Sequence, residues 1–388
     1  MSQDPQGAKP LPDLTIVRIE TVAVRVPLDR VYKGSHYRMT HRSTIITRVH
    51  TASGIIGEAY AGDEDAGLGE IDGIIHHEIE PVLIGQDAFS TEKCWTLARP
   101  ATWNILRDRR LGLVATACVD LAIWDAVGKA LTMPLHKLWG GYRTEVPVIT
   151  IGGYYAEDAN ITAEVNGLVE AGFAGMKFKI GGLTPDEDAV RFREARKAGG
   201  DSFKLAVDAN QGWTPAEAIR FCKLVQDLDL MWFEEPVIWQ NDRRGMRDVR
   251  MSAGVAVCAG QSEFSAAGCR DLMETGSIDY LNFDSSWSGG PTEWRRAAAI
   301  ASVYDVKMAH HEEPQVAAHL LASIPHGTFL EYFHPQRDPI WHNVIANRPE
   351  LKNGYITLPS GPGLGWELDL DYIEKYRIEF DHEPIAAH

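Results

Sequence analysis

The chain has 388 residues, a length that corresponds to about two or three domains. Hydrophobic residues make up 45% and charged residues 24%, which is ordinary for a globular protein. The 38 Lys and Arg residues are outnumbered by 54 Asp and Glu residues, so the formal net charge is −16. This charge excludes a general nucleic-acid binder, because phosphate binding needs a basic face. A small anionic substrate is still allowed, since it needs only a local positive field.

The cysteines and the N-terminal residues bear on the compartment. The five cysteines include no Cys-x-x-Cys spacing, which fits a reducing compartment and argues against disulfides or a thiolate zinc site. No apolar run approaches about 18 residues, so no transmembrane helix is predicted. Residues 1–13 are polar, lack the apolar core of a signal peptide, and are expected to form a disordered tail. We expect a cytoplasmic enzyme or binding protein with no membrane partner.

The first part of the chain changes its periodicity once. Residues 14–60 alternate polar and apolar side chains, which predicts an antiparallel meander. Helical periods take over in residues 67–137, and the clearest apolar stripe runs through residues 113–131. We therefore expect residues 14–145 to form an α+β capping domain.

From residue 146, short apolar runs alternate with amphipathic helical stretches. Eight such runs are spaced by about 20–30 residues, at 146–154, 175–181, 203–210, 230–236, 255–260, 280–284, 306–311 and 329–333. They predict an α/β fold with a (β/α)8-type barrel over residues 146–350. A doubly wound open sheet is the competing architecture, but it does not need eight similar units. Residues 351–388 return to turns and short strands, and we expect this tail to pack back on the capping domain and complete it.

Two lysines share one face of the second predicted strand. Because side chains alternate along a strand, Lys177 and Lys179 point to the opposite side from Met176, Phe178 and Ile180. The apolar set suits the surrounding helices, so both lysines are expected to face the barrel axis. Burying unpaired ammonium groups is costly, and a desolvated lysine beside another cation has a lowered pKa, as a general base requires. The plainer interpretation is a solvated lysine face of a half-exposed strand.

Further polar residues fall where the other predicted strands end, which is where barrel enzymes carry their catalytic groups. They are Asp208 and Asn210 on strand three, Glu234 on strand four, Asp284 on strand six, His310 and His311 on strand seven, and Glu331 on strand eight. Each one alone could be a turn residue, a helix cap or a salt-bridge partner. Collected at one end of one barrel, they favour a functional site. Oxygen ligands without thiolates indicate a hard cation, and Mg2+ is the favoured choice.

The order and spacing of these residues resemble the enolase superfamily, specifically its mandelate racemase-like branch. The resemblance covers nearly the whole chain from about Leu14, and residues 128–141 and 360–365 are also typical of the family. The matching positions are the Lys-x-Lys of Lys177 and Lys179, the Asp-x-Asn of Asp208 and Asn210, the Glu-Glu-Pro of residues 234–236, the pair of Asp284 and His311, and Glu331. His311 is chosen over His310 by its spacing from residues 318–322.

The resemblance implies a magnesium site with one unusual position. Asp208 and Glu234 would be the first two ligands, and the family's third ligand is an acid that follows a glycine after strand five. Here that register holds Gln261, whose amide oxygen can bind Mg2+ without contributing charge. Glu263 lies two residues further and could supply a carboxylate instead. The sequence leaves both Gln261 and Glu263 open as the third ligand.

The resemblance also implies a reaction in which the α-proton of a carboxylic acid is removed to give an enediolate. Lys179 would be the base on one face of the substrate. Lys177 would lower the pKa of Lys179 and help to hold the carboxylate. His311, oriented by Asp284, would act on the opposite face, and a protonated Glu331 would donate a hydrogen bond to the substrate carboxylate.

The substrate pocket is expected to be completed by the capping domain. The loop of residues 31–38 carries His36, Tyr37 and Arg38, which suit a hydroxylated anion. A solvated loop without such a role is the alternative. Asn210 of the Asp-x-Asn motif is expected to contact the substrate as well.

These residues support a ranked set of functions. The leading hypothesis is a hydro-lyase that dehydrates an acid sugar, an aldonate or aldarate, to a 2-keto-3-deoxy acid. A racemase or epimerase of a 2-hydroxy acid is the runner-up, since two bases flank the substrate. A cycloisomerase is disfavoured because that branch places a lysine where this chain has Asp284. The non-enzyme alternative is an acid-binding barrel whose metal site is weakened at Gln261. We expect a small carboxylate as the partner and a homo-oligomeric assembly.

Overall fold

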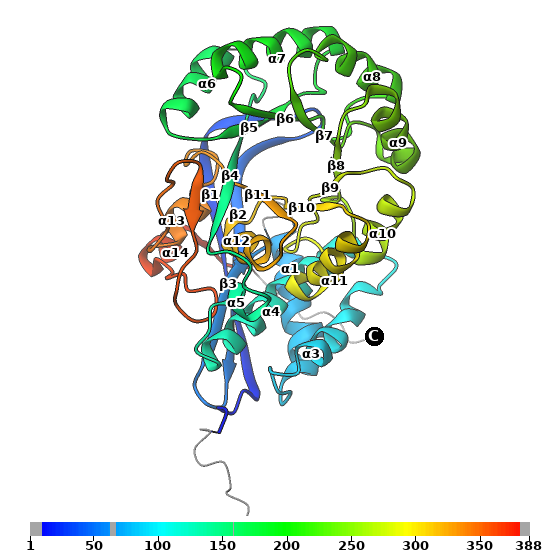
Figure 1. Ribbon diagram of the computed structural model, residues 1–388. Coiled ribbons are helices and arrows are strands. Elements are labelled where there is room, and N and C mark those ends of the chain that lie inside the picture. Colours follow the sequence, from blue (N-terminus) through cyan, green and yellow to red (C-terminus); the bar gives the residue numbers. More distant parts are fainter. Residues whose placement is uncertain (1–9, 63–66, 158, 381–388) are drawn as a thin grey trace, which may run out of the picture.

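The computed structural model describes residues 10–62, 67–157 and 159–380 (Figure 1). An antiparallel sheet with several helices, drawn in blue and cyan, lies against a closed barrel of parallel strands and outer helices, drawn from green to orange (Figure 1). The residues 1–9 of the expected tail and the last eight residues of the chain lie outside the described part.

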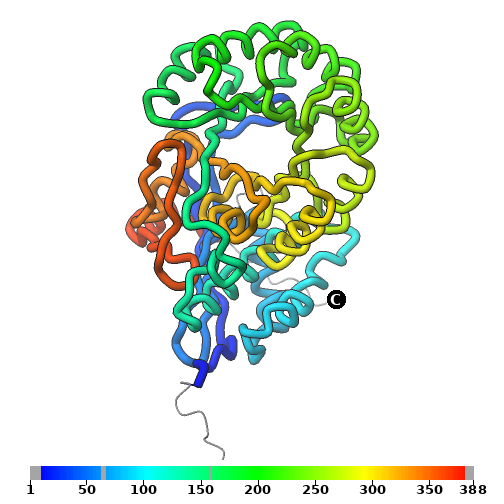
Figure 2. Tube along the Cα trace, in the orientation of Figure 1, coloured from blue at the N-terminus to red at the C-terminus, as the bar shows by residue number. Residues whose placement is uncertain are grey.

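The N-terminal sheet is the expected meander. It consists of β1 (Ile16–Lys33), β2 (Arg38–Thr51) and β3 (Ile56–Ala61), each antiparallel to the next. The turn between β2 and β3 reaches Gly54 at φ +83°, a conformation that suits glycine. The strands β1 and β2 are long, and their shared tip extends behind the barrel strands (Figure 2). This tip brings residues of the capping domain to the barrel.

Helices follow the meander, as the periodicity predicts. They are α1 (Leu68–Ile74), α2 (Glu80–Leu83), α3 (Thr91–Ala98), α4 (Arg109–Ala130) and α5 (Leu135–Leu138). Helix α4 begins at Asp108, whose side chain accepts a hydrogen bond from the Arg110 backbone. It packs closely on β3, because a Cβ at Gly57 would lie 1.9 Å from the Ala122 carbonyl oxygen. Helix α4 is long and apolar enough to span a membrane, with mean hydropathy 1.6, but 89% of that apolar window is buried in the structure.

The barrel contains the eight expected strands in sequence order, which confirms the predicted architecture. They are β4 (Glu145–Gly152), β5 (Gly175–Lys179), β6 (Lys204–Asp208), β7 (Leu230–Glu234), β8 (Val257–Ala259), β9 (Tyr280–Leu281), β10 (Lys307–His310) and β11 (Gly327–Glu331). Neighbouring strands are parallel, and β11 pairs with β4 to close the barrel.

Helices connect the barrel strands on the outside. They are α6 (Ile161–Glu170), α7 (Pro185–Gly199), α8 (Pro215–Leu224), α9 (Asp242–Ala253), α10 (Ala266–Glu274), α11 (Gly290–Val303), α12 (Pro314–Ser323) and α13 (Pro339–Val344). Helices α7 and α8 both start with a capping box, in which Thr184 pairs with Glu187 and Thr214 with Glu217. These local signals fix where each helix begins and therefore where the preceding strand-end loop stops.

The C-terminal segment joins the two parts of the molecule. The strand β12 (Tyr355–Thr357) pairs antiparallel with the barrel strand β4. After α14 (Leu370–Tyr376), the strand β13 (Arg377–Ile378) pairs antiparallel with β1 of the N-terminal sheet. The segment thus completes the capping sheet, as expected, and it also extends the barrel sheet, which the sequence did not predict.

Buried polar contacts fix the capping domain on the barrel. Asp120 of α4 accepts hydrogen bonds from the backbone and the hydroxyl of Thr292 in α11, at 2.9 and 2.8 Å. At the other end of the domain, the Ser35 hydroxyl donates to the backbone oxygen of Ala209, after β6. The tip of β1 and β2 is therefore held against the carboxyl ends of the barrel strands.

Candidate active site

The structure places both lysines of β5 inside the barrel. Lys177 is 1% exposed and Lys179 is 5% exposed, while the alternating apolar side chains of the strand face the helices. The Lys177 ammonium donates to Glu234 Oε1 at 2.6 Å and also to Glu331 Oε1, and it lies 3.7 Å from Asp208 Oδ2. Burial alone would lower the pKa of Lys177, but the charges of these carboxylates outweigh it and raise the pKa well above its ordinary value.

Lys179 is held by the same Asp208 oxygen that Lys177 approaches. Its ammonium donates to Asp208 Oδ2 at 2.6 Å and to Asn210 Oδ1 at 2.9 Å, and it lies 5.5 Å from the centre of the Tyr37 ring. Burial lowers the pKa of Lys179, but the Asp208 charge outweighs burial and raises it above the ordinary value. The prediction that the pKa of Lys179 is lowered is therefore wrong for this structure. The Asp208 carboxylate raises this pKa more than the Lys177 charge lowers it.

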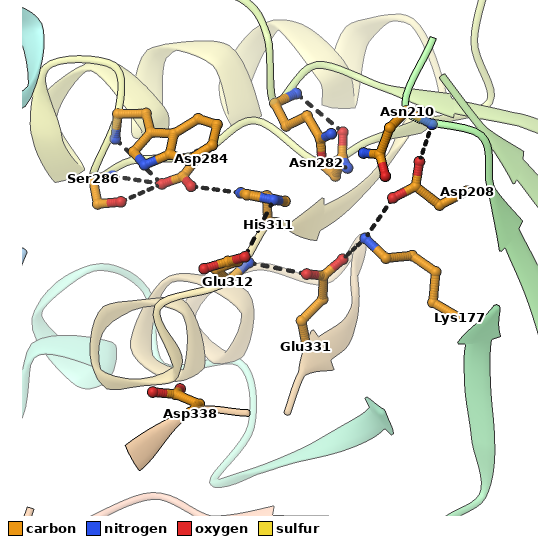
Figure 3. Close-up of polar contacts among 12 residues, drawn as sticks. Lys177, Asp208, Asn210, Asn282, Asp284, Ser286, His311, Glu312, Glu331 and Asp338 are labelled. Carbon is orange, nitrogen blue, oxygen red and sulfur yellow. Dashed lines mark hydrogen bonds and ion pairs between the residues drawn. The ribbon is translucent and has the colours of Figure 1, made fainter. Parts of the chain in front are cut away.

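His311 forms a dyad with Asp284. The Nδ1 atom of His311 lies 2.8 Å from Asp284 Oδ2, and the other oxygen of Asp284 accepts from the backbone and hydroxyl of Ser286 (Figure 3). Burial would lower the pKa of His311, but the hydrogen bond to Asp284 and the charges of Glu312 and Glu331 raise it to about 9. At neutral pH the imidazole is protonated. His310 turns away and bonds Ser285, so only His311 faces the site.

These groups line one cavity of about 760 Å³ between the barrel and the capping domain. Lys177, Lys179 and Asn210 lie on its wall, and so do His311, Trp287 and Glu331. His36, Tyr37 and Arg38 contribute from the tip between β1 and β2, as the sequence led us to expect. The structure therefore brings together residues from the two ends of the chain at the carboxyl ends of the strands.

The two candidates for the third metal ligand occupy different places. Gln261 lines the cavity, where its Nε2 donates to Glu235 Oε2 at 3.0 Å and its Oε1 accepts from Asn282 at 3.2 Å. Glu263 does not line this cavity, and its Oε1 forms an ion pair with Arg243 Nη2 at 2.6 Å. The structure thus favours the register position, Gln261, over the carboxylate of Glu263.

Sequence reasoning missed a charged cluster beside His311. Glu312 directly follows His311, and its carboxylate lies 2.7 Å from Arg42 and 3.4 Å from Arg337. The distance from Glu312 Oε1 to His311 Nε2 is 3.8 Å. All four side chains lie on the cavity wall. Glu312 belongs to the His-His-Glu-Glu-Pro segment of the sequence. Arg42 lies in β2 and Arg337 in a loop after β11, and no sequence motif indicated that these arginines would be near Glu312.

Backbone strain is concentrated at this end of the barrel. Among the described residues other than glycine, nine have positive φ, and five of them follow strands that end at the cavity: Asn210, Gln211, Glu235, Glu312 and Glu313. Such conformations cost about 1–3 kcal/mol each and persist where the surroundings enforce them. Their placement here supports a site that is built for function.

The residues present fit a divalent cation. Three buried carboxylates, those of Asp208, Glu234 and Glu331, form ion pairs with Lys177 and Lys179, and the buried carboxyl of Glu235 follows Glu234 directly. A cluster in which carboxyl groups outnumber ammonium groups suits a hard cation. The described residues hold no group of three or more His, Cys, Asp or Glu side chains in a metal-binding arrangement. Asp208, Glu234 and Gln261 would hold the ion.

Comparisons with known proteins agree with this geometry. Residues 16–140 match the N-terminal domain of mandelate racemase and muconate lactonizing enzyme, and residues 160–372 match the enolase C-terminal domain-like family. A mandelate racemase/muconate lactonizing enzyme from a marine actinobacterium, crystallised with magnesium, is 60% identical with a TM-score of 0.90. The match covers 94% of this chain and 100% of that one.

Curated relatives differ in the reaction they catalyse. The 3,6-anhydro-alpha-L-galactonate cycloisomerase of Streptomyces coelicolor is 30% identical over 94% of this chain and 99% of its own length. The arabinonate dehydratase of Saccharolobus solfataricus is 27% identical over 86% of this chain and 91% of its own length. Relatives at similar identity include an epimerase and a racemase. The domain matches show that the chain belongs to the mandelate racemase/muconate lactonizing enzyme family of the enolase superfamily.

Proposed function

We propose that this protein is a Mg2+-dependent hydro-lyase that dehydrates an acid sugar, an aldonate or aldarate, to a 2-keto-3-deoxy acid. The observation that carries the proposal is the protonation state of His311. Its pKa of about 9 makes it an imidazolium at neutral pH, which can deliver a proton to a leaving hydroxide. Removal of an α-proton and protonation of the β-hydroxyl together release water and leave an enol, which becomes the keto acid.

The other residues have roles that follow from their positions. We assign removal of the α-proton to Lys179, because it lines the cavity and is more exposed than Lys177. It has to act as the neutral amine, and the Asp208 charge that keeps it protonated in this structure would be offset by a cation held at Asp208. Lys177 is more deeply buried and places a positive charge beside the substrate carboxylate and the enediolate. Asn210, which already accepts from Lys179, contacts the substrate. When bound, the Mg2+ ion supplies Lewis-acid stabilisation of the carboxylate charge, held by Asp208, Glu234 and Gln261.

The cavity wall supports a substrate with several hydroxyl groups. The capping tip contributes the rings of His36 and Tyr37 and the guanidinium of Arg38, and the barrel contributes Gln211 and Ser262. These side chains can donate and accept hydrogen bonds to a polyhydroxylated acid. The wall also carries apolar groups, so the substrate need not be hydroxylated along its whole length.

A racemase or epimerase of a 2-hydroxy acid is the second candidate, and one specific observation favours it. His311 and Lys179 approach the cavity from different strands, so a proton could be removed on one face and returned on the other. In that reaction a neutral His311 has to act as base in one direction. The raised pKa of His311 therefore predicts that racemisation would increase toward pH 9.

One experiment separates these reactions. The protein is incubated with Mg2+ and a panel of aldonates, aldarates and simpler 2-hydroxy acids in deuterated water. Keto-acid formation is assayed with semicarbazide, and exchange at the α-carbon is followed by proton NMR. Dehydration predicts a keto acid from at least one acid sugar, and a folded Lys179→Met variant that forms none. Exchange or inversion without loss of water would establish the second candidate, and neither outcome with any acid would contradict both.

A further inference from the structure

The carboxylate of Glu312 lies beside the nitrogen of His311 that is available to a substrate. Asp284 holds Nδ1 of the ring at 2.8 Å, so Nε2 is the nitrogen from which a proton can pass into the cavity. Glu312 Oε1 lies 3.8 Å from this Nε2, which is too far for a direct hydrogen bond (Figure 3). A small gap on the cavity wall therefore separates a proton donor from a carboxylate. Glu312 is not among the residues to which the family resemblance gives a role.

Glu312 is held in this place through its backbone and its side chain. Its backbone has φ +48°, and its N–H donates to Glu331 Oε2 at 3.1 Å. Its carboxylate pairs with Arg42 at 2.7 Å and with Arg337 at 3.4 Å. Arg337 is itself fixed, because its Nε donates to the Tyr154 hydroxyl at 3.2 Å. Since Arg42 comes from the capping domain and Arg337 from the barrel, both domains set the orientation of the carboxylate.

Stability alone does not account for this cluster. Arg42 and Arg337 are 3% and 2% exposed, and Glu312 is 8% exposed. Taking such charges out of water is costly, and replacing a buried ion pair by well-packed apolar residues is often neutral or stabilising. The left-handed backbone of Glu312 adds strain to the same place. A carboxylate that is retained here, next to the proton donor, points to a use in the cavity.

The gap between His311 Nε2 and Glu312 Oε1 has the size of one hydroxyl group. An oxygen about 2.8 Å from each of these atoms, which are 3.8 Å apart, forms two hydrogen bonds at an angle of about 85°. A movement of Glu312 by less than about 1 Å opens this angle to the tetrahedral value. A hydroxyl has one proton to donate and two lone pairs that accept, so it satisfies both partners at once. A carboxylate of the substrate does not suit this place, because Glu312 would repel it.

We propose that Glu312 accepts a hydrogen bond from the substrate hydroxyl that leaves as water, and so turns a lone pair of that oxygen toward His311 Nε2. This inference rests on the proposed dehydration. The hydrogen bond to an anion also increases the electron density on the hydroxyl oxygen, which makes this oxygen a better acceptor for the imidazolium proton. Glu312 itself transfers no proton. It positions the leaving group and selects acids that carry a neutral hydroxyl on the β-carbon.

The elimination step is balanced with these groups. The electron pair left at the α-carbon forms the C=C bond, and the C–O bond at the β-carbon breaks with its electrons going to oxygen. This oxygen takes the proton from His311 Nε2 and departs as water, which leaves His311 neutral. Racemisation breaks no C–O bond, so it gives Glu312 no such role.

The test compares two reactions within each protein. Wild type, Glu312→Gln and Glu312→Asp are incubated with Mg2+ in deuterated water, with D-gluconate, D-galactonate, D-xylonate and galactarate as probes. Keto-acid formation reports elimination, and deuterium in the recovered acid reports removal of the α-proton without elimination. Gln removes the charge and Asp withdraws the carboxylate from Nε2. We expect both variants to raise the ratio of exchange to elimination about 10–100-fold, the effect of one hydrogen bond to a charged group.

The ratio separates this role from a structural one. A loss of folded protein lowers both reactions together and leaves the ratio as it is. Each protein is assayed at least one pH unit below its own His311 pKa, measured by 15N-histidine NMR, so that the imidazole is protonated in all of them. Glu293→Gln is the matched control and should keep the wild-type ratio. Glu293 is as buried as Glu312 and pairs with Arg296 at 2.6 Å, outside the active-site cavity.

A fluorinated analogue gives an independent check. In the 3-deoxy-3-fluoro analogue of a probe that reacts, the leaving group is fluoride, which has no proton to donate to Glu312. Wild type and Glu312→Gln should therefore eliminate fluoride at similar rates. A Glu312→Gln variant with the wild-type ratio, or with equal losses on the hydroxy and the fluoro acid, would overturn the inference and leave the proposed dehydration intact. Wild type that forms no keto acid from any probe would overturn the dehydration and the inference with it.

Discussion

Replacing Asp284 by asparagine tests the electrostatic basis of the proposed reaction. Asp284 is fully buried, and its Oδ2 lies 2.8 Å from His311 Nδ1. Asparagine has nearly the same shape and its amide oxygen can still accept from Ser286, so the fold should survive. The negative charge beside the imidazole is lost. The remaining charged groups that face His311 are Glu312, on the loop after β10, and Glu331 at the end of β11.

The size of the effect follows from the pKa of His311. In wild type this pKa is raised from 6.5 to about 9, which corresponds to about 3 kcal/mol between the two protonation states. Because the folded pKa is the higher one, protonation stabilises the folded protein fully below pH 6.5, and this stabilisation is lost as the pH rises through 9. Without Asp284, burial dominates and the pKa of His311 should fall below about 7. The pH-dependent stabilisation should then shrink to less than about 1 kcal/mol.

Two measurements check this prediction. The imidazole of His311 is titrated by NMR in 15N-histidine-labelled protein, with its signal assigned by comparison with His311→Gln. Urea unfolding at pH 6 and pH 10 gives the pH-dependent part of the unfolding free energy for wild type and Asp284→Asn. The difference in unfolding free energy between the two pH values is taken within each protein, so a pH-independent loss of packing in the variant cancels from it. A His311 pKa that stays near 9 in Asp284→Asn would refute the assignment of the dyad.

Three further predictions concern separate parts of the site. Lys179→Met should lower the rate of α-proton exchange at least about 100-fold while leaving Mg2+ affinity within a few fold, as measured by NMR and calorimetry. Removing divalent ions with EDTA should lower the unfolding temperature, and 10 mM Mg2+, as a roughly saturating choice, should restore it in a thermal scan. Arg42→Met leaves Glu312 with a poorer partner in a buried setting, so urea unfolding should show a loss of about 3 kcal/mol.

The sequence predicted the parts of the structure that depend on local pattern. Eight apolar runs with regular spacing became eight strands, because each run is short and is bounded by amphipathic helical patterns. The inward direction of Lys177 and Lys179 followed from the two-residue period of a strand, since Met176 and Phe178 have to face the helices. Strand ends of a parallel barrel meet at one edge, so residues such as Asp208 and Asp284 could be assigned to one site without knowing any tertiary contact.

What the sequence could not predict depends on contacts between distant segments. Arg42 and Arg337 are 295 positions apart and meet only because β2 passes behind the barrel mouth. The sequence left Glu263 and Gln261 both open as the third ligand, one as a carboxylate and the other by register, and only the structure shows Glu263 paired with Arg243. The pKa of Lys179 was expected to fall because Lys177 is near, and the structure shows that Asp208 is nearer.

The two sides of the cavity differ in what their carboxylates contact. Within the described ranges, the hydrogen bonds of Asp284 go to the His311 ring and to the turn at Ser286 and Trp287, and none of them involves a candidate metal ligand. Asp208 contacts Lys179 and also belongs to the candidate metal site. A change at the metal position therefore reaches the lysine side directly, whereas it reaches the histidine dyad through Glu331, which pairs with Lys177 and also raises the pKa of His311. A site for racemisation needs two sides that can exchange roles, whereas elimination of water needs one side to accept a proton and the other to donate one. The asymmetry of Asp208 and Asp284 is thus an argument for the elimination that we propose, in which the two sides keep different roles.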